Sequence, residues 1–585
     1  MYGREVEMKG LYKYIAPYKN TVILAITLKA ISTICELMIP FLMSYVIDEG
    51  IRHRNIELII VLCGAMLVMT ILGWFITARA HILAVKGGQN IGESLRNILF
   101  DHIQKLTIYD VEKVSTASLI TRVTSDVEHI QRTVMMTCRM MVRGPLIMIG
   151  GTVMSLLLDP YLTCVMFGGM FLLFGVSMIS FKLTRPIYRQ AKQNLDKMTS
   201  ILRENLGGMR QIKAFGKIVE EVERLDKQSR TIKDFELKAG KVNAYTGPLV
   251  SLVVNVTIIL ILIVSGMRVN AGELQIGKIV TILNYINMVL SAMMAIPRMF
   301  MMYSQASSSG TRIQEVLSLE TYTQYGEATT PVREDSVLAF KEVCFKYPYT
   351  KQYALENISF HISRGETMAI IGTTGAGKTS ILNLILRLYE PTKGQIYFQG
   401  RNIKDYDKKY LTQKITAAMQ QYNIFSMSIK ENIILDKAFD EERLEESVNS
   451  AQIRELLEEL DEHFEHEISQ NGNNLSGGQK QRISVARTLY RQSDLVILDD
   501  VSSALDYKTD LKLRQALREN YAKQTVILIA QRISSIKNAD KILVLEEGKQ
   551  VGLGTHESLL QTCQVYREIC KAQEKGEMEL YETII

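Results

Sequence analysis

Long uncharged apolar stretches in the first half of this 585-residue chain restrict its fold more than any other feature. Three of them carry no charged side chain over 21 residues or more: 58–78, 160–181 and 242–267. A helix needs about 20 such residues to cross a membrane, because lipid cannot satisfy the polar groups of an exposed backbone. Three weaker stretches complete a set of six: 21–47, 144–158 and 279–297. The sequence therefore predicts an α-helical domain with six membrane spans over residues 1–317.

Lysine and arginine are distributed unevenly between the connections of these spans. The connection 182–241 holds 15 of them and 79–143 holds nine, whereas the other three connections hold four in total. Basic residues favour the cytosolic side of a membrane. We therefore expect an integral membrane protein with both termini and both long connections in the cytosol. The net charge of +6 is too small to suggest nucleic acid as a partner.

The two long connections predict helical hairpins. Each runs about 60 residues, far beyond an ordinary loop, and each is rich in helix formers. An arm of about 30 residues reaches up to about 45 Å, so the membrane helices are expected to continue into the cytosol. The turns are expected near Tyr109-Asp110 and near Gly207-Gly208. The alternative is a pair of amphipathic surface helices without a mechanical role.

Two features of the spans suggest contacts with a transported molecule. Glu36 is costly in lipid, so it should face the bundle interior or a water-filled cavity, where it could contact a cationic substrate. A structural partner such as Lys29 is the alternative. Met288 and Met293 belong to a methionine-rich sixth span, which suits varied apolar ligands. Ordinary helix packing explains the same methionines.

The second half predicts an α/β nucleotide-binding domain at 337–572, after a polar linker at 318–336 and before a charged tail at 573–585. Alternating apolar residues predict strands, and the strand at 367–372 runs directly into GTTGAGKT (372–379) and then a helix. A strand, a glycine-rich turn and a helix in this order indicate a phosphate-binding loop. Its backbone N–H groups and helix amino end suit phosphates. Lys378 is expected on the β/γ oxygens and Thr379 on magnesium.

Two further motifs complete the prediction of ATP and Mg²⁺ as cofactors. LSGGQ (475–479) lies about a hundred residues later, and LVILDD (495–500) follows it. Asp499, at the carboxyl end of a buried strand, can orient magnesium. Ser476, Gly477 and Gly478 offer a hydroxyl, close backbone approach and a helix amino end, all suited to a γ-phosphate.

These motifs closely resemble the ATP-binding-cassette (ABC) family, and six spans ahead of the cassette resemble its exporter branch. The resemblance implies that Tyr347 stacks on adenine and that Gln420 contacts magnesium and senses the membrane domain. It implies head-to-tail pairing with a second half-transporter, and coupling helices near 107–115 and 207–216. The residues expected around ATP are Tyr347, Thr373, Thr374, Gly375, Ala376, Gly377, Lys378, Thr379, Ser380, Gln420, Ser476, Gly477, Gly478, Gln479 and Asp506, with Thr379, Gln420 and Asp499 on the metal.

The chain departs from the family pattern at two catalytic positions. Asp500 stands where the family has its catalytic glutamate, and Gln531 stands where it has its switch histidine. Aspartate is one methylene shorter, and loss of a well-placed base costs roughly 10²–10⁴-fold in rate. The pattern resembles the degenerate-site subunit of bacterial heterodimeric multidrug exporters. This resemblance implies a bacterial cytoplasmic membrane and the export of amphipathic compounds or drugs out of the cell. A homodimer that hydrolyses slowly with Asp500, or a transporter of lipid or peptide, remains the alternative.

Overall fold

The computed structural model describes residues 13–319, 325–332, 335–348, 350–420, 422–460 and 462–573. The chain forms two compact units. The helical unit consists of Met1–Gln104 and Ser115–Leu319, and the sheet unit consists of Lys105–Val114 and Glu320–Ile585. The short segment Lys105–Val114 thus groups with the sheet unit, although it lies in sequence between two long apolar helices. Parts of the expected linker (320–324 and 333–334) and of the expected tail (574–585) lie outside the described residues.

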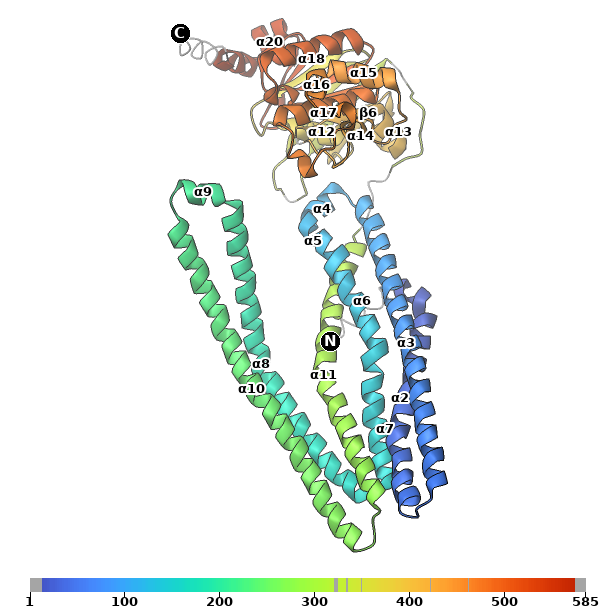
Figure 1. The fold of residues 1–585 in the computed structure, drawn as a ribbon. Coiled ribbons are helices and arrows are strands. Elements are labelled where there is room, and N and C mark those ends of the chain that lie inside the picture. The colour runs from blue at the N-terminus through green and yellow to red at the C-terminus, as the bar shows by residue number, and fades with distance from the viewer. Residues whose placement is uncertain are drawn as a thin grey trace. The chain divides into compact units, whose positions relative to one another are not determined.

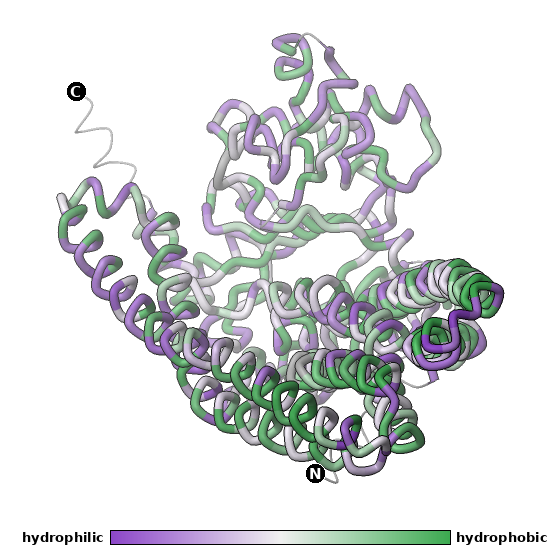
Figure 2. The backbone as a smooth tube through the Cα atoms, turned by 60° about the horizontal axis from the view of Figure 1, so that its bottom comes forward, coloured by the Kyte–Doolittle hydropathy of each residue, from purple (hydrophilic) through white to green (hydrophobic). Residues whose placement is uncertain are grey.

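Six helical segments in the described part of the chain are long and apolar enough to cross a membrane. Each overlaps one of the predicted stretches, which confirms their number, and Figure 2 shows the hydrophobic residues concentrated along the long helices. The elements are α2 (Lys19–Tyr45), η2 (Val46–Ile51), α3 (Ile56–Lys105), α4 (Ile108–Val114), α5 (Thr116–Thr121), η3 (Arg122–Asp126), α6 (Val127–Met136), η4 (Thr137–Met141), α7 (Arg143–Leu158), α8 (Pro160–Gly207), α9 (Met209–Ala214), α10 (Ile218–Asn270) and α11 (Ile276–Leu317).

The helices α8 and α10 form one long hairpin, joined by the short helix α9 (Figure 1). They contain 48 and 53 residues, so each is about 70–80 Å long, more than twice the hydrocarbon thickness of a bilayer. The predicted continuation of the spans into long helical arms is therefore confirmed. The turn falls at Gly208, as predicted, and the short helix α4 follows α3 at the other predicted turn.

Buried carboxylates fix the helical unit at two places. Asp159 caps the amino end of α8 by accepting from Leu162 N at 2.9 Å, and it forms an ion pair with Arg268 of α10. Asp126, only 1% exposed, accepts from Ser309 Oγ and Arg312 Nε of α11, each at 2.8 Å. A buried charge is stable only when it is paired and hydrogen-bonded, so these contacts hold the helices in register.

The sheet unit contains one ten-stranded sheet with the order β5-β4-β1-β2-β10-β9-β3-β8-β7-β6. The strands β9, β3, β8, β7 and β6 are parallel, whereas the pairs of β1 with β2 and β4, of β4 with β5, and of β9 with β10 are antiparallel. The strands are β1 (Ser336–Phe345), β2 (Leu355–Ser363), β3 (Thr367–Gly372), β4 (Lys393–Phe398), β5 (Arg401–Asn402), β6 (Ile415–Ala418), β7 (Leu495–Asp499), β8 (Thr525–Ile529), β9 (Lys541–Glu546) and β10 (Lys549–Gly554).

Helices cover this sheet and enclose its hydrophobic core. They are α12 (Lys378–Ile385), α13 (Lys408–Lys414), α14 (Ile429–Ile434), α15 (Glu441–Ser450), α16 (Arg454–Glu459), α17 (Gly477–Tyr490), α18 (Tyr507–Asn520), α19 (Ile533–Ile536) and α20 (His556–Thr562). The central strand β7 is buried over its whole length, as its apolar sequence predicts. The parallel strands β3, β6, β7 and β8 end at one edge of the sheet, where α/β proteins bind their ligands.

Candidate functional site

The glycine-rich loop between β3 and α12 requires its glycines. Gly377 has a φ of +99°, and a Cβ atom there would lie 2.6 Å from Leu355 Cδ2 and 2.8 Å from the carbonyl oxygen of Ala354. The half-buried ammonium of Lys378 donates to the carbonyl oxygens of Gly372 at 2.7 Å and Thr373 at 3.0 Å. Lys378 is therefore held over the loop by neutral acceptors that an anionic ligand can replace.

A pocket of about 320 Å³ opens at this loop. It brings together most of the nucleotide and metal residues predicted from the sequence, and adds three residues that the sequence analysis did not name. The predicted residues in its lining are Tyr347, Thr374, Gly375, Ala376, Gly377, Lys378, Thr379, Ser380, Gln420, Asp499, Asp500 and Gln531, and the additional residues are Ala354, Ile529 and Ala530. Thr373 is not in the lining, although its carbonyl oxygen holds Lys378.

Asp500 is clamped by amides at the bottom of this pocket. Its backbone is left-handed (φ +50°), and its N–H donates to the carbonyl oxygen of Ile529 at 2.7 Å. Its carboxylate oxygen Oδ2 accepts from Gln420 Nε2 at 3.2 Å and from Gln531 Nε2 at 3.0 Å. The two glutamines come from loops after β6 and β8, so the sheet itself fixes the position of this carboxylate.

Asp499 and Lys378 form the electrostatic centre of the pocket. Burial of Asp499 and the adjacent charge of Asp500 raise the pKa of Asp499 to about 6. Burial lowers the pKa of Lys378, whereas the two carboxylates oppose that shift. A divalent cation beside Asp499 would favour its ionised form. The pocket therefore fits a magnesium-bound nucleotide. The glycine-rich loop and Lys378 suit its phosphates, the Thr379 hydroxyl and the Asp499 carboxylate suit the metal, and the metal would neutralise phosphate charge.

Tyr347 connects the pocket to the short helix α4. Its hydroxyl lies 3.1 Å from Ser380 Oγ, and its ring packs edge-on against Tyr389, with centroids 5.3 Å apart. Tyr389 in turn donates to Glu112 Oε2 of α4 at 3.2 Å. Burial, together with the nearby Glu112 carboxylate, raises the pKa of Tyr389 to about 12, so the phenol stays a donor.

Sequence reasoning missed Tyr389. The segment 379–389 reads as one apolar helix, but α12 ends at Ile385, and Arg387 then adopts a φ of +53°. This turn places Tyr389 beside Tyr347 and α4. The only signal in the sequence for a role of Tyr389 is its aromatic ring at the end of an apolar run.

The LSGGQ segment lies outside this chain's own pocket. Ser476 caps α17 by accepting from Gln479 N at 3.3 Å, and the Gln479 side chain accepts from Ser476 N at 2.7 Å. Ser476 and Gly477 are exposed at the start of the helix, while Asp506 caps α18 through Thr509 N at 3.1 Å. Of the residues predicted around ATP, Ser476, Gly477, Gly478, Gln479 and Asp506 therefore do not meet the others within one chain.

Glu36 pairs with a residue that the sequence analysis did not name. It accepts from Arg143 Nε at 3.1 Å and also from Arg143 Nη2, so its hydrogen-bonded structural partner is Arg143 and not Lys29. Lys29 is buried and interacts electrostatically with Glu36, Arg143 and Arg139. Among these described residues, one carboxylate and three basic groups interact through Lys29.

The two methionines predicted as substrate contacts lie mainly in helix packing. Met288 packs against Ile147, Val289 and Ala292, and Met293 is 8% exposed among the apolar residues of α8, α10 and α11. Met293 also lines an apolar groove of about 260 Å³, together with Phe174, Phe181 and Phe300. The packing alternative thus explains Met288, while Met293 has both a packing contact and a groove.

Comparison with known proteins covers nearly the whole chain. Residues 22–293 match the family model described as ABC transporter transmembrane region, and residues 355–503 match the model described as ABC transporter. The chain is 33% identical to the uncharacterized ABC transporter ATP-binding protein YfiB of Bacillus subtilis, over 97% of this chain and 98% of that protein. It is 27% identical to the putative multidrug export ATP-binding/permease protein YgaD of Bacillus subtilis, over 97% and 99%.

The fold matches a solved structure, that of a bacterial Atm1-family ABC exporter with ATP bound. The TM-score is 0.77 over 95% of this chain and 99% of that chain, with 21% sequence identity. This likeness shows that the six-span helical unit and the sheet unit have the arrangement of elements found in such exporters.

The raised pKa of Asp499 predicts a pH-dependent metal contribution to nucleotide binding. Lowering the pH from 7.5 to 5.5, through the value of about 6, should weaken the Mg²⁺-dependent part of ATP affinity about fourfold, because metal ligation needs the carboxylate. The folding stability of the protein without nucleotide changes with pH in the opposite direction. Protonation of Asp499 stabilises the folded state fully below the ordinary pKa of 3.8, and this stabilisation is lost as the pH rises through about 6. Titration of ATP with and without Mg²⁺ at both pH values measures this. Asp499→Asn should remove the pH dependence, and an equal Mg²⁺ contribution at both pH values would contradict the prediction.

The hydrogen bond of Tyr389 predicts that this residue anchors α4. Tyr389→Phe keeps the ring but removes the donor to Glu112, a charged acceptor, so local opening of α4 should become about tenfold easier. Hydrogen exchange of the amides of residues 108–114 measures this opening. Tyr410→Phe, which removes a bond to Gln399 elsewhere in the same unit, serves as the matched control. Exchange of α4 that stays unchanged in Tyr389→Phe would show that the bond is not an anchor.

Proposed function

The chain belongs to the ABC transporters, as an exporter-type half-transporter with its membrane region fused to its ATP-binding domain, and we propose that it is the ATP-holding subunit of a heterodimer. It is an integral membrane protein with six spanning helices. In the proposed heterodimer this chain binds ATP in its own pocket with little turnover. A related second chain supplies the site that hydrolyses ATP rapidly.

The amide clamp on Asp500 is the observation that carries this proposal. A general base must lie within about 3 Å, measured between heavy atoms, of the water whose proton it takes. The carboxylate of Asp500 is one methylene short of the family's glutamate, and Oδ2 is already bonded to Gln420 and Gln531. Gln531 also lacks the positive charge that a histidine can carry at the γ-phosphate. Both departures act on the same step, so ATP should bind and remain.

The residues for holding nucleotide are present in the same pocket. Tyr347 would stack on the adenine, the glycine-rich loop and Lys378 would hold the phosphates, and Thr379, Gln420 and Asp499 would hold magnesium, directly or through water. The intact LSGGQ segment supports the second part of the proposal. Because Ser476 and Gly477 are exposed and capped in a regular geometry, they can meet a phosphate presented by the partner chain.

The basic connections support an orientation with the cassette and both termini in the cytosol of a bacterium, in its cytoplasmic membrane. The proposed direction of transport is outward, since the fusion of cassette and membrane region is the exporter layout. The proposed substrates are amphipathic molecules, which agrees with the name of the relative YgaD, a putative multidrug export protein. The groove of Phe174, Phe181, Met293 and Phe300 offers an apolar surface for them.

The charge of the cluster around Glu36 favours an anionic amphiphile over a cationic one. Arg143 already neutralises Glu36, and Lys29 and Arg139 leave an excess of positive charge. Glu36 alone suggested a cationic substrate, but the basic residues around it favour an anionic one. Export of a lipid or peptide by the same cavity remains the second candidate, since an anionic lipid would meet the same residues.

If this chain holds ATP and the partner's site hydrolyses it, substitutions in the two chains should have unequal effects. Replacing the partner's catalytic glutamate by glutamine should lower ATP turnover of the mixed dimer roughly 10²–10³-fold, because the only well-placed base is lost. Asp500→Asn in this chain should lower turnover less than about threefold. Steady-state ATP hydrolysis in lipid nanodiscs measures both.

The alternative of a slow homodimer gives the opposite result. In that case this chain alone in a bilayer would hydrolyse ATP, and Asp500→Asn would abolish that activity. Near-normal turnover of the mixed dimer after substitution of the partner's glutamate would refute the heterodimer proposal.

The basic cluster predicts a charge preference in substrate stimulation. An anionic amphiphile such as lysophosphatidylglycerol should stimulate ATP hydrolysis by the mixed dimer at lower concentration than dodecyltrimethylammonium. Glu36→Gln, which frees Arg143, should lower the half-maximal concentration of the anion about threefold, and Arg143→Gln should raise it by a similar factor. Arg132→Gln, which removes an exposed ion pair with Glu128, is the matched control. A preference for the cation would contradict the anionic substrate class.

A further inference from the structure

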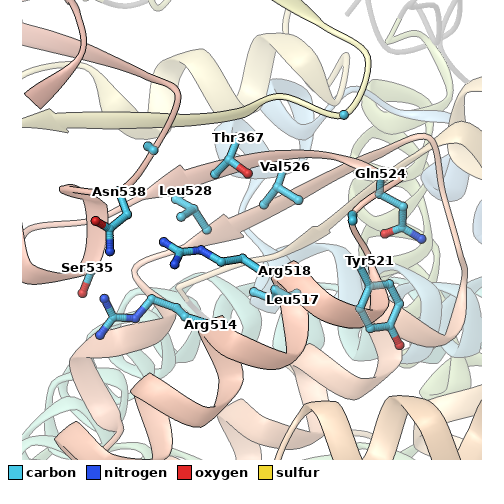
Figure 3. A pocket seen from close by; sticks show the side chains of 13 residues that line it. Thr367, Arg514, Leu517, Arg518, Tyr521, Gln524, Val526, Leu528, Ser535 and Asn538 are labelled. Carbon is cyan, nitrogen blue, oxygen red and sulfur yellow. The ribbon is translucent and has the colours of Figure 1, made fainter.

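A second cavity of the sheet unit lies away from the glycine-rich loop. Its volume is about 170 Å³, and it is enclosed by α18, by the beginnings of β3 and β8, and by the segment that follows α19 (Figure 3). Leu517 of α18 and Val526 and Leu528 of β8 form an apolar floor. None of the motifs that the sequence analysis singled out accounts for this cavity.

Two buried polar atoms at this cavity lack a partner among the described residues. Ser535 is 8% exposed, and its hydroxyl makes no hydrogen bond there. The side-chain oxygen Oε1 of Gln524 is also buried without a hydrogen bond. Native structures rarely leave such atoms unpaired unless water or a ligand completes them. Of the two, the Ser535 hydroxyl is a donor and marks a position where an anionic group would be hydrogen-bonded.

The cavity is electropositive. Among the described residues, its lining includes two arginines and no acidic residue. Arg514 is neutralised by Asp510 and donates to the carbonyl oxygen of Ser534 at 2.5 Å. Arg518 is exposed and has no ion pair among the described residues. Its guanidinium therefore remains available to an anion.

The donors of the cavity converge on one end of it. Figure 3 shows the guanidinium of Arg518 and the amide of Asn538 directed toward the side on which Ser535 lies. A guanidinium, an amide and a hydroxyl together can bind the oxygens of a carboxylate or phosphate. The apolar floor extends away from this end, toward Tyr521 and Gln524.

We propose that this cavity is a regulatory binding site for a small molecule with an oxyanion attached to a compact apolar group. The oxyanion, a carboxylate or a phosphate monoester, is bound by Arg518, Asn538 and Ser535. The apolar group lies on Leu517, Val526 and Leu528. The two headgroups share the same recognition chemistry, and the experiment below distinguishes them.

The cavity adjoins the nucleotide pocket through β8. A small space next to it is lined by Arg514, Leu528 and Ser535 of the cavity and also by Ile529 and Ala530, which line the nucleotide pocket. Ser535 follows Gln531, a member of the Asp500 clamp, by four residues. A ligand that binds Ser535 restrains this segment, so its binding is coupled to that of ATP, and the coupling is reciprocal.

Titration calorimetry on the full-length chain in lipid nanodiscs tests the binding. The probes are benzoate, phenyl phosphate, inorganic phosphate and benzamide, each in the presence of excess MgATP so that the glycine-rich loop is filled. Benzoate, phenyl phosphate or both should bind at least about tenfold more tightly than benzamide and inorganic phosphate, because both the charge and the apolar group contribute. The tighter of the two identifies the headgroup. Benzamide that binds as tightly as benzoate and phenyl phosphate would overturn the proposal.

Variants separate this site from non-specific binding. Arg518→Ala should weaken the tighter probe about tenfold and Ser535→Ala by a smaller factor. Lys523→Ala removes an exposed basic residue close to α18 that does not line the cavity, and it should leave binding unchanged. Arg518 is exposed, so its removal should not prevent folding. Unchanged binding in Arg518→Ala would overturn the assignment.

The proposed regulatory role is tested separately, by measuring ATP affinity. The ATP affinity of the chain, measured by equilibrium binding, should change at least about fivefold when the tighter probe is saturating, and Arg518→Ala should abolish that change. Binding of the probe without any effect on ATP affinity would overturn the regulatory role. Failure of the heterodimer proposal would appear in the ATP turnover of the mixed dimer and would leave these binding results unchanged.

Discussion

Two adjacent carboxylates at the buried end of β7 impose the main physical constraint on this protein. Asp499 and Asp500 are 4% and 7% exposed, and burial favours their neutral forms. The ammonium of Lys378 and the amides of Gln420 and Gln531 are therefore arranged around them. The same arrangement that stabilises the pair directs Asp500 toward amides. This packing supports the proposal that the site holds nucleotide and splits it slowly.

The helical unit also contains charged side chains in apolar surroundings, and it stabilises them with ion pairs between helices. Its charged residues lie within or beside apolar helices, where an unpaired charge is costly. Asp159 pairs with Arg268, Asp126 pairs with Arg312, and Glu36 pairs with Arg143. The first two pairs fix helix positions. The third belongs to a cluster with a basic excess, on which the proposed preference for anionic substrates rests.

The sheet unit links its nucleotide pocket to two other features. Tyr347 and Tyr389 connect the pocket to Glu112 of α4, the short segment that groups with this unit although it belongs in sequence to the spanning half. On the other side, β8 separates the pocket from the cavity that Arg518 and Ser535 line. The proposed coupling of this cavity to the nucleotide rests on the residues of β8 that lie between the two sites.

The sequence by itself determined the six spans, the long helical arms, the strand–loop–helix order and the positions of Lys378, Asp499 and Asp500. It could do so because the length of an apolar run, the period of a strand and the spacing of glycines are local properties. It did not determine the partner of Glu36, the contact of Tyr389 with Glu112, or the clamp of Gln420 and Gln531 on Asp500. These contacts join residues that are 107, 277 and 80 or 31 positions apart, and only the tertiary structure decides which distant side chains meet.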